Sequence, residues 1–411
     1  MPPVPLLAAA SHPSALKPGN ICDYVERNVE PFSERPLCAP DSLVLSWYAN
    51  FRLEALGEQV RGWGRPGGTT AGARLQETLR AECFDGLFDL WGPAGCKRLL
   101  QAMAASPRFR DVHVIGHVSE REGGATEHPK QFSAVTFVLD DTTAYVAFRG
   151  TDATFAGWRE DFDMTFMRPV PSQRAALAYL REASAHVGRR HLVVGGHSKG
   201  GNLAVYAAAE APEELQGRID RVFSHDGPGF DAAFLSSAGF KRIASRVDKT
   251  VPQSSVVGMM LETQEDYSIV RSTSRGIFQH DPFSWVVHGQ AFEEVEGISA
   301  GARHVDAAMN AWIAGRTPEE RERFTNELYG FLGAADIEYI AELRDSWQTV
   351  LPTLLQRVGD MDPETRRFMI ATVAALAREL LAIAGPQDRA ESKPAGPGEL
   401  ADPKEARAPR P

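Results

Sequence analysis

The sequence has no run of about 20 apolar residues, and a helix needs such a run to cross a bilayer. Its most apolar long stretch, residues 369–384, is interrupted by Arg378 and Glu379. The first residues include a short apolar piece, but no basic stretch precedes it and prolines break it, which is atypical of a signal peptide. A cytoplasmic protein is therefore expected.

Cysteine and net positive charge are also scarce. The 411 residues include four cysteines, with no C-x-x-C pair and no Cys/His cluster, so neither a disulfide framework nor a zinc site is expected. The net charge of −10 argues against a general nucleic-acid binder, which would carry a basic face. All the cysteines stand in the first quarter of the chain and are expected to be buried or free thiols: Cys22, Cys38, Cys83 and Cys96.

The composition that is present, 43% hydrophobic and 24% charged, is that of a globular protein with a sizeable core. We expect a loose N-terminal arm over residues 1–20 and one large α/β domain over 21–295, whose first part, 21–110, is helical. A C-terminal helical region is expected over 296–385. The tail over 386–411 is rich in Pro, Ala and charge and has no aromatic residue, which predicts disorder.

Apolar runs with strand-like and helix-like periods alternate through the middle of the chain. The expected helices lie at 41–54 (amphipathic), 172–187, 318–332, 335–351 and 363–384, and the expected strands at 112–118, 132–139, 144–148, 191–195 and 219–224. The second and third strands form an antiparallel hairpin, because only a short polar turn separates them. The later alternation of strand and helix predicts a mainly parallel sheet with flanking helices.

The stretch HLVVGGHSKGGNLAVYAAAE, residues 191–210, carries the clearest chemical signal. An apolar strand meets a glycine turn, with Ser198 at the centre of G-H-S-K-G, and a helix-forming run follows at once. Such a nucleophile elbow needs small neighbours, here Gly196, Gly200 and Gly201, because strand and helix pack closely. The turn exposes the serine hydroxyl and directs the N–H of Lys199 at the reacting carbonyl. The alternative is a glycine-rich turn whose serine only caps the helix.

A serine nucleophile needs a histidine base, and in this order of elements the base comes late in the chain. His280, in GIFQHDPFSW, follows the strand-like run YSIVRST and suits a base carried on a loop. His288 is the rival, with a packed histidine at a strand end as the alternative interpretation. His225, at the end of the strand over 219–224, is expected to be structural.

The base needs an acid to orient it, and four aspartates compete. Asp226, in FSHDGPGF, follows a strand and precedes a rigid turn, so it stands where catalytic groups of a parallel sheet collect. Asp248 and Asp266 are rivals, although Asp266 precedes a strand and suits a turn cap. Asp281 adjoins His280, and adjacent side chains seldom converge. We favour Asp226.

The second oxyanion donor should come from an earlier strand end. The strand over 144–148 runs into Arg149, Gly150 and Thr151, and a backbone N–H with the Thr151 hydroxyl would face the serine. The residues that follow, including Asp161, are expected to shape the loop. A strand that ends in a charged turn is the alternative.

Three of these blocks together resemble a known group. AFRGT…W…DF followed by GGHSKGGNLA is similar to the class 3 lipase-like branch of the α/β hydrolases. NICDYVERNV, SHDGPGF, VPQSSVVGMMLE and GIFQHDPFSW extend the resemblance, over about residues 18–295, to the Mbeg-like family of bacterial lipase-like proteins. The resemblance implies an α/β-hydrolase fold with Ser198 as nucleophile, His280 as base and Thr151 in the oxyanion hole. Class 3 lipases carry their acid in a block that here reads VDKTVPQSSVVG, where Ser254 and Ser255 occupy the equivalent place.

The sequence thus predicts a serine hydrolase acting on carboxylic esters of lipids or short acyl chains, through an acyl-enzyme on Ser198 and without metal or organic cofactor. Its catalytic residues would be Ser198, Asp226 and His280, with Thr151 and Lys199 at the oxyanion hole. The alternative is a non-catalytic scaffold of the same fold that binds a ligand or a protein partner. An acyltransferase or a peptidase would use the same triad.

Overall fold

The computed structural model describes most of the chain up to residue 333. The described residues are 18–63, 72–88, 92–122, 128–152, 155–255, 257–261, 266–299, 301–303, 310, 313, 315–333, 363, 366 and 367. The expected tail, nearly all of the expected N-terminal arm, the helix expected over 335–351 and nearly all of the helix expected over 363–384 therefore lie outside them. No helix of the described part is long and apolar enough to span a membrane.

A twisted sheet of eight strands runs through the described part, and its strands lie in sequence order. The first four pair antiparallel and the strands from β4 onward pair parallel. The strands are β1 (Ala73–Arg74), β2 (His113–Glu122), β3 (Lys130–Val138), β4 (Thr143–Phe148), β5 (His191–His197), β6 (Ile219–His225), β7 (Val247–Pro252) and β8 (Ser268–Val270), with a separate pair β9 (Val287–His288) and β10 (Ala291–Phe292).

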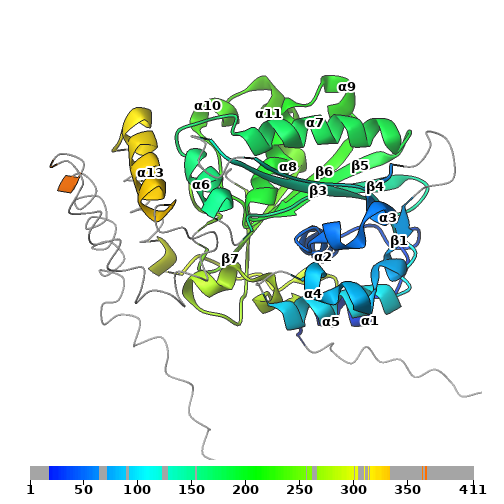
Figure 1. Ribbon diagram of the computed structural model, residues 1–411. Helices are drawn as coiled ribbons and strands as arrows, with labels where there is room; N and C mark the ends of the chain where they lie inside the picture. The colour runs from blue at the N-terminus through cyan, green and yellow to red at the C-terminus, as the bar shows by residue number, and fades with distance from the viewer. Residues whose placement is uncertain are drawn as a thin grey trace, which may run out of the picture.

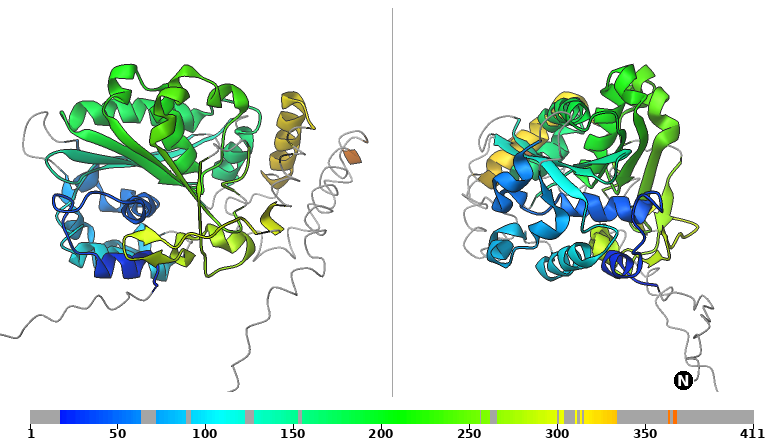
Figure 2. Two further views of the ribbon diagram at one scale, coloured as in Figure 1. Left: turned by 180° about the vertical axis from the view of Figure 1, so that it is seen from behind. Right: turned by 90° about the vertical axis from the view of Figure 1, so that its right-hand side faces the viewer.

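Helices cover both faces of the sheet (Figures 1 and 2). Helices α7, α8 and α11 lie on one face and α1, α2 and α5 on the other. The helices are α1 (Ile21–Arg27), α2 (Ala39–Tyr48), α3 (Glu58–Arg61), α4 (Phe84–Leu87), α5 (Pro93–Ala105), α6 (Phe155–Asp163), α7 (Pro171–His186), α8 (Lys199–Glu210), α9 (Glu213–Gln216), α10 (Ala232–Leu235), α11 (Ala238–Ile243) and α13 (Pro318–Gly333).

Alternation along the buried strands builds the two core layers. In β4, Tyr145 and Ala147 pack on the side of α2, whereas Val146 and Phe148 pack on the side of α7 and α8. All four are fully buried, as expected of an interior strand covered on both faces. The fold is α/β, with a mainly parallel central sheet flanked by helices, which confirms that part of the predicted fold class.

Helix α2 differs from the expected amphipathic helix over 41–54. It begins at Ala39 and ends at Tyr48, and nearly every residue in it is buried. The N–H of Cys38 donates to Asp41 at 3.0 Å, which fixes the helix start two residues before the position that the pattern suggested. Because the sheet covers one side of α2 and α1 covers another, the helix exposes no polar face to solvent.

The segment after Thr151, expected to be a loop, forms helix α6. Helix α13, distant in sequence, packs beside it (Figure 1). The rings of Phe162 and Tyr329 lie 6.1 Å apart, and Arg321 donates to the carbonyl oxygen of Thr165. The helix expected over 318–332 is therefore present, and it covers the outer side of α6.

Candidate active site

The elbow follows β5 as the sequence predicted. Ser198 has φ 58° and ψ −133°, a strained conformation for a residue with a side chain, and α8 begins at the next residue. A Cβ atom on Gly196 would lie 2.2 Å from the carbonyl carbon of Gly200, and one on Gly200 would lie 2.2 Å from the carbonyl oxygen of Phe148. Strand and helix therefore approach as closely as a nucleophile elbow requires.

The predicted acid and base meet at the carboxyl edge of the sheet. Asp226 follows β6 with φ 52° and is fully buried, and its Oδ2 lies 2.6 Å from Nδ1 of His280. Because a carboxylate only accepts, Nδ1 carries the proton and Nε2 is left as the basic nitrogen. His280 ends the 3-10 helix η5 (Gly276–His280), and its side chain is 28% exposed, which leaves the ring accessible.

Two donors that sequence reasoning did not assign hold the other oxygen of Asp226. Ser255 Oγ donates to Oδ1 at 2.5 Å, and the N–H of Gly258 donates to the same oxygen at 3.1 Å. The backbone N–H of Asp226 donates to Thr250 at 2.7 Å. One signal was visible in the sequence, because the resemblance to class 3 lipases implies an acid where Ser254 and Ser255 stand. In the structure, Ser255 instead donates to Asp226, the predicted acid, which follows the neighbouring strand β6.

His197 links the elbow to the segment that carries the base. Its Nε2–H donates to the carbonyl oxygen of His280 at 2.9 Å, and the two rings lie 4.6 Å apart. Burial lowers the pKa of His197 well below its usual value, so this ring is neutral. Within the described residues, Ser198 Oγ makes no hydrogen bond to His280. In enzymes without substrate, such bonds are often long and tighten in the complex.

The rival aspartates lie elsewhere. Asp248, on β7, forms an ion pair with Arg221, and Asp266 is exposed. Asp281 accepts the N–H of Phe283 at 3.0 Å and caps a short helix. None of the three contributes a hydrogen bond to His280 in the described part of the chain.

The other two histidines have different surroundings from His280. His288 is exposed on β9. His225 is fully buried, and its Nε2 lies 2.9 Å from Ser42 Oγ of α2. Burial lowers the pKa of His225 to about 3. Both members of this second Ser–His pair are fully buried, so we interpret the pair as structural, as the sequence indicated for His225.

The predicted oxyanion loop lies against the elbow. A Cβ atom on Gly150 would be 2.8 Å from the carbonyl oxygen of His197 and 3.3 Å from Cβ of Ser198. The N–H of Gly150 donates to Asn50 Oδ1 at 3.0 Å, which fixes the loop to the end of α2. Sequence reasoning did not assign Asn50, because nothing local pairs it with a residue 100 positions away.

Thr151 is tied to α6. Its hydroxyl donates to Asp161 Oδ2 at 2.6 Å. Burial raises the pKa of Asp161 to about 6, while the charge of Lys199 and the bond from Thr151 lower it. A residue that titrates near neutral pH therefore adjoins the expected oxyanion hole.

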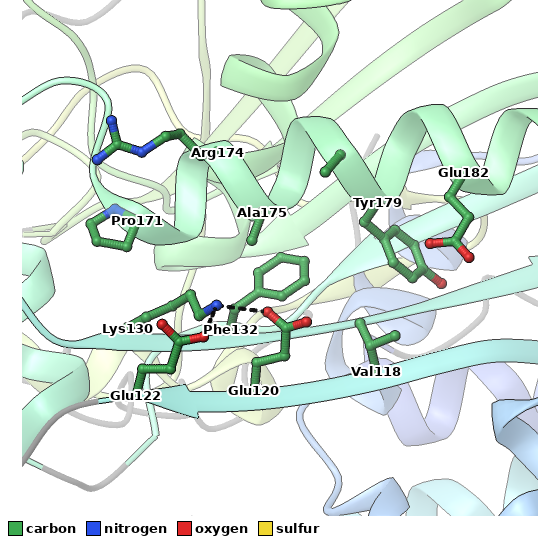
Figure 3. Close-up of a pocket in the computed structure, with 11 residues that line it drawn as sticks. Val118, Glu120, Glu122, Lys130, Phe132, Pro171, Arg174, Ala175, Tyr179 and Glu182 are labelled. Atoms are coloured by element: carbon green, nitrogen blue, oxygen red, sulfur yellow. Dashed lines mark ion pairs between the residues drawn. The ribbon is translucent and has the colours of Figure 1, made fainter.

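A groove of about 430 Å³ lies away from this site, between α7 and strands β2 and β3 (Figure 3). Lys130 lies at its edge, paired with Glu120 and Glu122, and Tyr179 contributes to its apolar wall. No predicted catalytic residue lines it. Nor do the described residues contain a cluster of three or more His, Cys, Asp or Glu side chains suited to a metal ion, and none of the four cysteines forms a disulfide.

Comparison with known proteins places the chain in a wider group. The model of the family described as Mbeg1-like matches residues 103–330, more than half of the chain. A search of the curated proteins found no match to this chain.

Among solved structures, the chain is similar to a Rhizomucor miehei lipase propeptide complex, at 17% identity and TM-score 0.31, covering 45% of this chain and 68% of the lipase. M37 lipase is similar at 17% identity and TM-score 0.31, and the match covers 41% of this chain and 64% of the lipase. A lipase from Rhizopus microsporus var. chinensis is similar at 16% identity and TM-score 0.29, and the match covers 46% of this chain and 74% of the lipase. These values mark a distant resemblance.

Proposed function

This chain belongs to the Mbeg1-like family, and from its own geometry we propose that it is a serine hydrolase that cleaves carboxylic esters. The observation that carries the proposal is the 2.6 Å contact between Asp226 and His280 at the sheet edge where the elbow presents Ser198. A nucleophile, a base and an orienting acid at one edge are the requirements of acyl transfer through a covalent intermediate.

The proposed reaction has two halves. Nε2 of His280 takes the hydroxyl proton as Ser198 Oγ attacks the carbonyl carbon, and the carbonyl oxygen becomes negative. The backbone N–H of Lys199 and a donor of Thr151 stabilise that charge. His280 then gives its proton to the leaving alcohol, and the acyl group stays on Ser198. Water, activated by His280, releases the acid, while Asp226 keeps Nδ1 protonated throughout.

The Thr151 hydroxyl acts differently in the two protonation states of Asp161. With Asp161 ionised, the hydroxyl proton is committed to that carboxylate. A protonated Asp161 donates its own proton to Thr151 Oγ1, which frees the hydroxyl for the oxyanion. Since the pKa of Asp161 is raised to about 6, both states are accessible near neutral pH.

We infer an ester of a lipid or of a short acyl chain as the substrate, because the proposed machinery acts on the acyl carbon and leaves the alcohol unspecified. The second candidate is a non-catalytic scaffold that binds a ligand or a partner. The observation in its favour is that Ser198 Oγ has no hydrogen bond to His280 among the described residues.

Ester turnover separates the two candidates. The purified protein should hydrolyse p-nitrophenyl butyrate, and Ser198→Ala should lower kcat on the order of 10³-fold or more, because it removes the nucleophile. Ser42→Ala is the matched control, because Ser42 also contacts a histidine but is fully buried. It should leave kcat within about twofold of the parent protein, since surface access and the triad are unchanged. A Ser198→Ala variant as active as the parent protein would favour the scaffold.

A further inference from the structure

The side chain that follows the nucleophile is buried. Lys199 is 0% exposed, and its ammonium has three donors. Three acceptors surround Nζ: the carbonyl oxygen of Gln131 at 2.8 Å, the Oε1 atom of the same residue at 2.7 Å and Glu160 Oε2 at 3.0 Å. Its hydrogen-bonding capacity is thus satisfied within the protein, away from Ser198 Oγ, which argues against a Ser–Lys dyad.

Glu160 of α6, which pairs with Lys199, also accepts hydrogen bonds from neighbouring elements. It is also fully buried, and Ser172 at the start of α7 donates to it twice, from N at 2.7 Å and from Oγ at 2.6 Å. The N–H of Gln131 in β3 adds a donor at 3.2 Å. The Lys199–Glu160 pair therefore joins the elbow to α6, α7 and β3.

The next residue of α6 reaches the other side of the site. Asp161 accepts the hydroxyl of Thr151, whereas Glu160 accepts the ammonium of Lys199. Two consecutive carboxylates of one helix thus contact the two residues expected to supply the oxyanion donors. Gln131 adds a link, because its Oε1 also accepts the N–H of Asp152 at 3.4 Å.

We propose that Glu160 and the side chain of Lys199 are positioning residues that hold the two oxyanion donors at a fixed separation through α6. The inference rests on the proposed function, because it assigns these residues a part in the same reaction. Neither side chain contacts the substrate. They act through the backbone N–H of Lys199 and through Thr151.

A contribution to stability alone does not explain why the buried ion pair Lys199–Glu160 is present. Taking two charges out of water is costly, and buried ion pairs are often replaced by apolar side chains without loss of stability. The need to position the oxyanion donors does explain the pair. An oxyanion donor is effective only about 2.7–3.1 Å from the developing charge, and a misplacement of about 1 Å can cost on the order of 10²-fold in rate.

The test removes both charges together, so that no unpaired charge stays buried. The double variant Lys199→Met/Glu160→Gln keeps the length of the Glu160 side chain, replaces the lysine with an unbranched side chain that is one heavy atom shorter, and keeps the backbone N–H. On p-nitrophenyl butyrate its kcat should fall about 10- to 100-fold, with KM within about twofold, because an interaction made only in the transition state is weakened. Hydrogen exchange of the amides of 155–163 and 199–201 should be faster, whether or not esters are turned over.

The matched control is a second fully buried ion pair of the described residues, Asp41–Arg108, whose atoms lie 2.6 Å apart among the N-terminal helices. Arg108→Met/Asp41→Asn should lower Tm but leave the kcat of the folded protein unchanged. If the Lys199→Met/Glu160→Gln protein keeps the parent kcat and exchange rates, or if the control loses kcat equally, the positioning role is wrong. If the double variant does not fold, Glu160→Gln alone decides: a several-fold loss of kcat at constant KM supports the role, and an unchanged kcat overturns it.

Failure of the proposed function is a separate result. In that case the parent protein turns over no ester, while the exchange rates still report whether the pair holds α6 against the elbow.

Discussion

Asp226 has the surroundings that an orienting acid needs. It is buried, one of its oxygens faces His280, and the other is occupied by Ser255 and Gly258. With both oxygens engaged, the carboxylate cannot rotate without losing a hydrogen bond, so the imidazole has one favoured orientation. The choice of acid is therefore a matter of hydrogen bonds to single atoms.

Two substitutions compare the candidate acids. Asp226→Asn should keep the shape of the site but permit the wrong imidazole tautomer, lowering kcat by up to ~10⁴-fold. Asp248→Asn removes an ion pair with Arg221 at the other end of β7, and its kcat should stay within about twofold of the parent value. Steady-state kinetics on p-nitrophenyl butyrate provides the measurement. A larger loss for Asp248→Asn would show that the acid has been misassigned.

A second pair compares the candidate bases. His280→Ala removes the group that would accept the Ser198 proton, and kcat should fall on the order of 10³-fold or more. His288→Ala alters an exposed side chain on β9 and should change kcat much less. Both variants should be assayed with circular dichroism as a check on folding. The reverse order of effects would contradict the assignment of His280.

At the scale of elements, the sequence predicted those parts that rest on local pattern. The hairpin of β3 and β4, the strands β5 and β6 and the helix α7 follow from apolar period and turn residues, and all are present. The elbow is local too, since the glycines and Ser198 are adjacent in sequence.

What escaped prediction depends on contacts between distant residues. Helix α2 lacks a polar face because other elements cover it, and α6 is a helix although a loop was expected. Ser255 and Asn50 act on residues 29 and 100 positions away. No periodicity carries such information, whereas the position of Asp226 at a strand end was visible in the local pattern.

Asp161 in helix α6 is expected to make the stability of the protein depend on pH. The pKa of Asp161 is raised to about 6 from an ordinary value near 3.8, so folding favours the protonated form. The resulting stability is fully present below pH 3.8 and is lost as pH rises through about 6. Asp161→Asn stays neutral, so its Tm relative to the parent protein should be higher at pH 8 than at pH 4. The difference should be several degrees, since a pKa moved from 3.8 to about 6 is worth up to roughly 3 kcal/mol and ~1 kcal/mol shifts Tm by ~2–4 °C in such a domain.

Differential scanning calorimetry of both proteins at the two pH values measures this effect. The pKa of Asp163 is raised to about 6 as well, but Asp163 is present in both proteins and therefore drops out of the difference. An equal Tm difference at pH 4 and pH 8 would mean that folding does not raise the pKa of Asp161.

At the scale of the whole molecule, the site joins segments from most of the described chain. Asn50 comes from the N-terminal helical layer, Ser198 and Asp226 from the centre of the sheet and His280 from beyond β8, while α13 packs on the helix that holds Thr151. Unfolding any one layer should therefore disturb the site.

Labelling with an activated fluorophosphonate, followed by peptide mapping, is the direct test of Ser198 as the nucleophile. The reagent forms a covalent bond with a serine that a neighbouring base activates, so it reports the proposed chemistry without knowledge of the substrate. We expect one labelled peptide, containing Ser198, and no label in the Ser198→Ala variant. Labelling of that variant to the same extent, or no labelling of the folded parent protein, would contradict it.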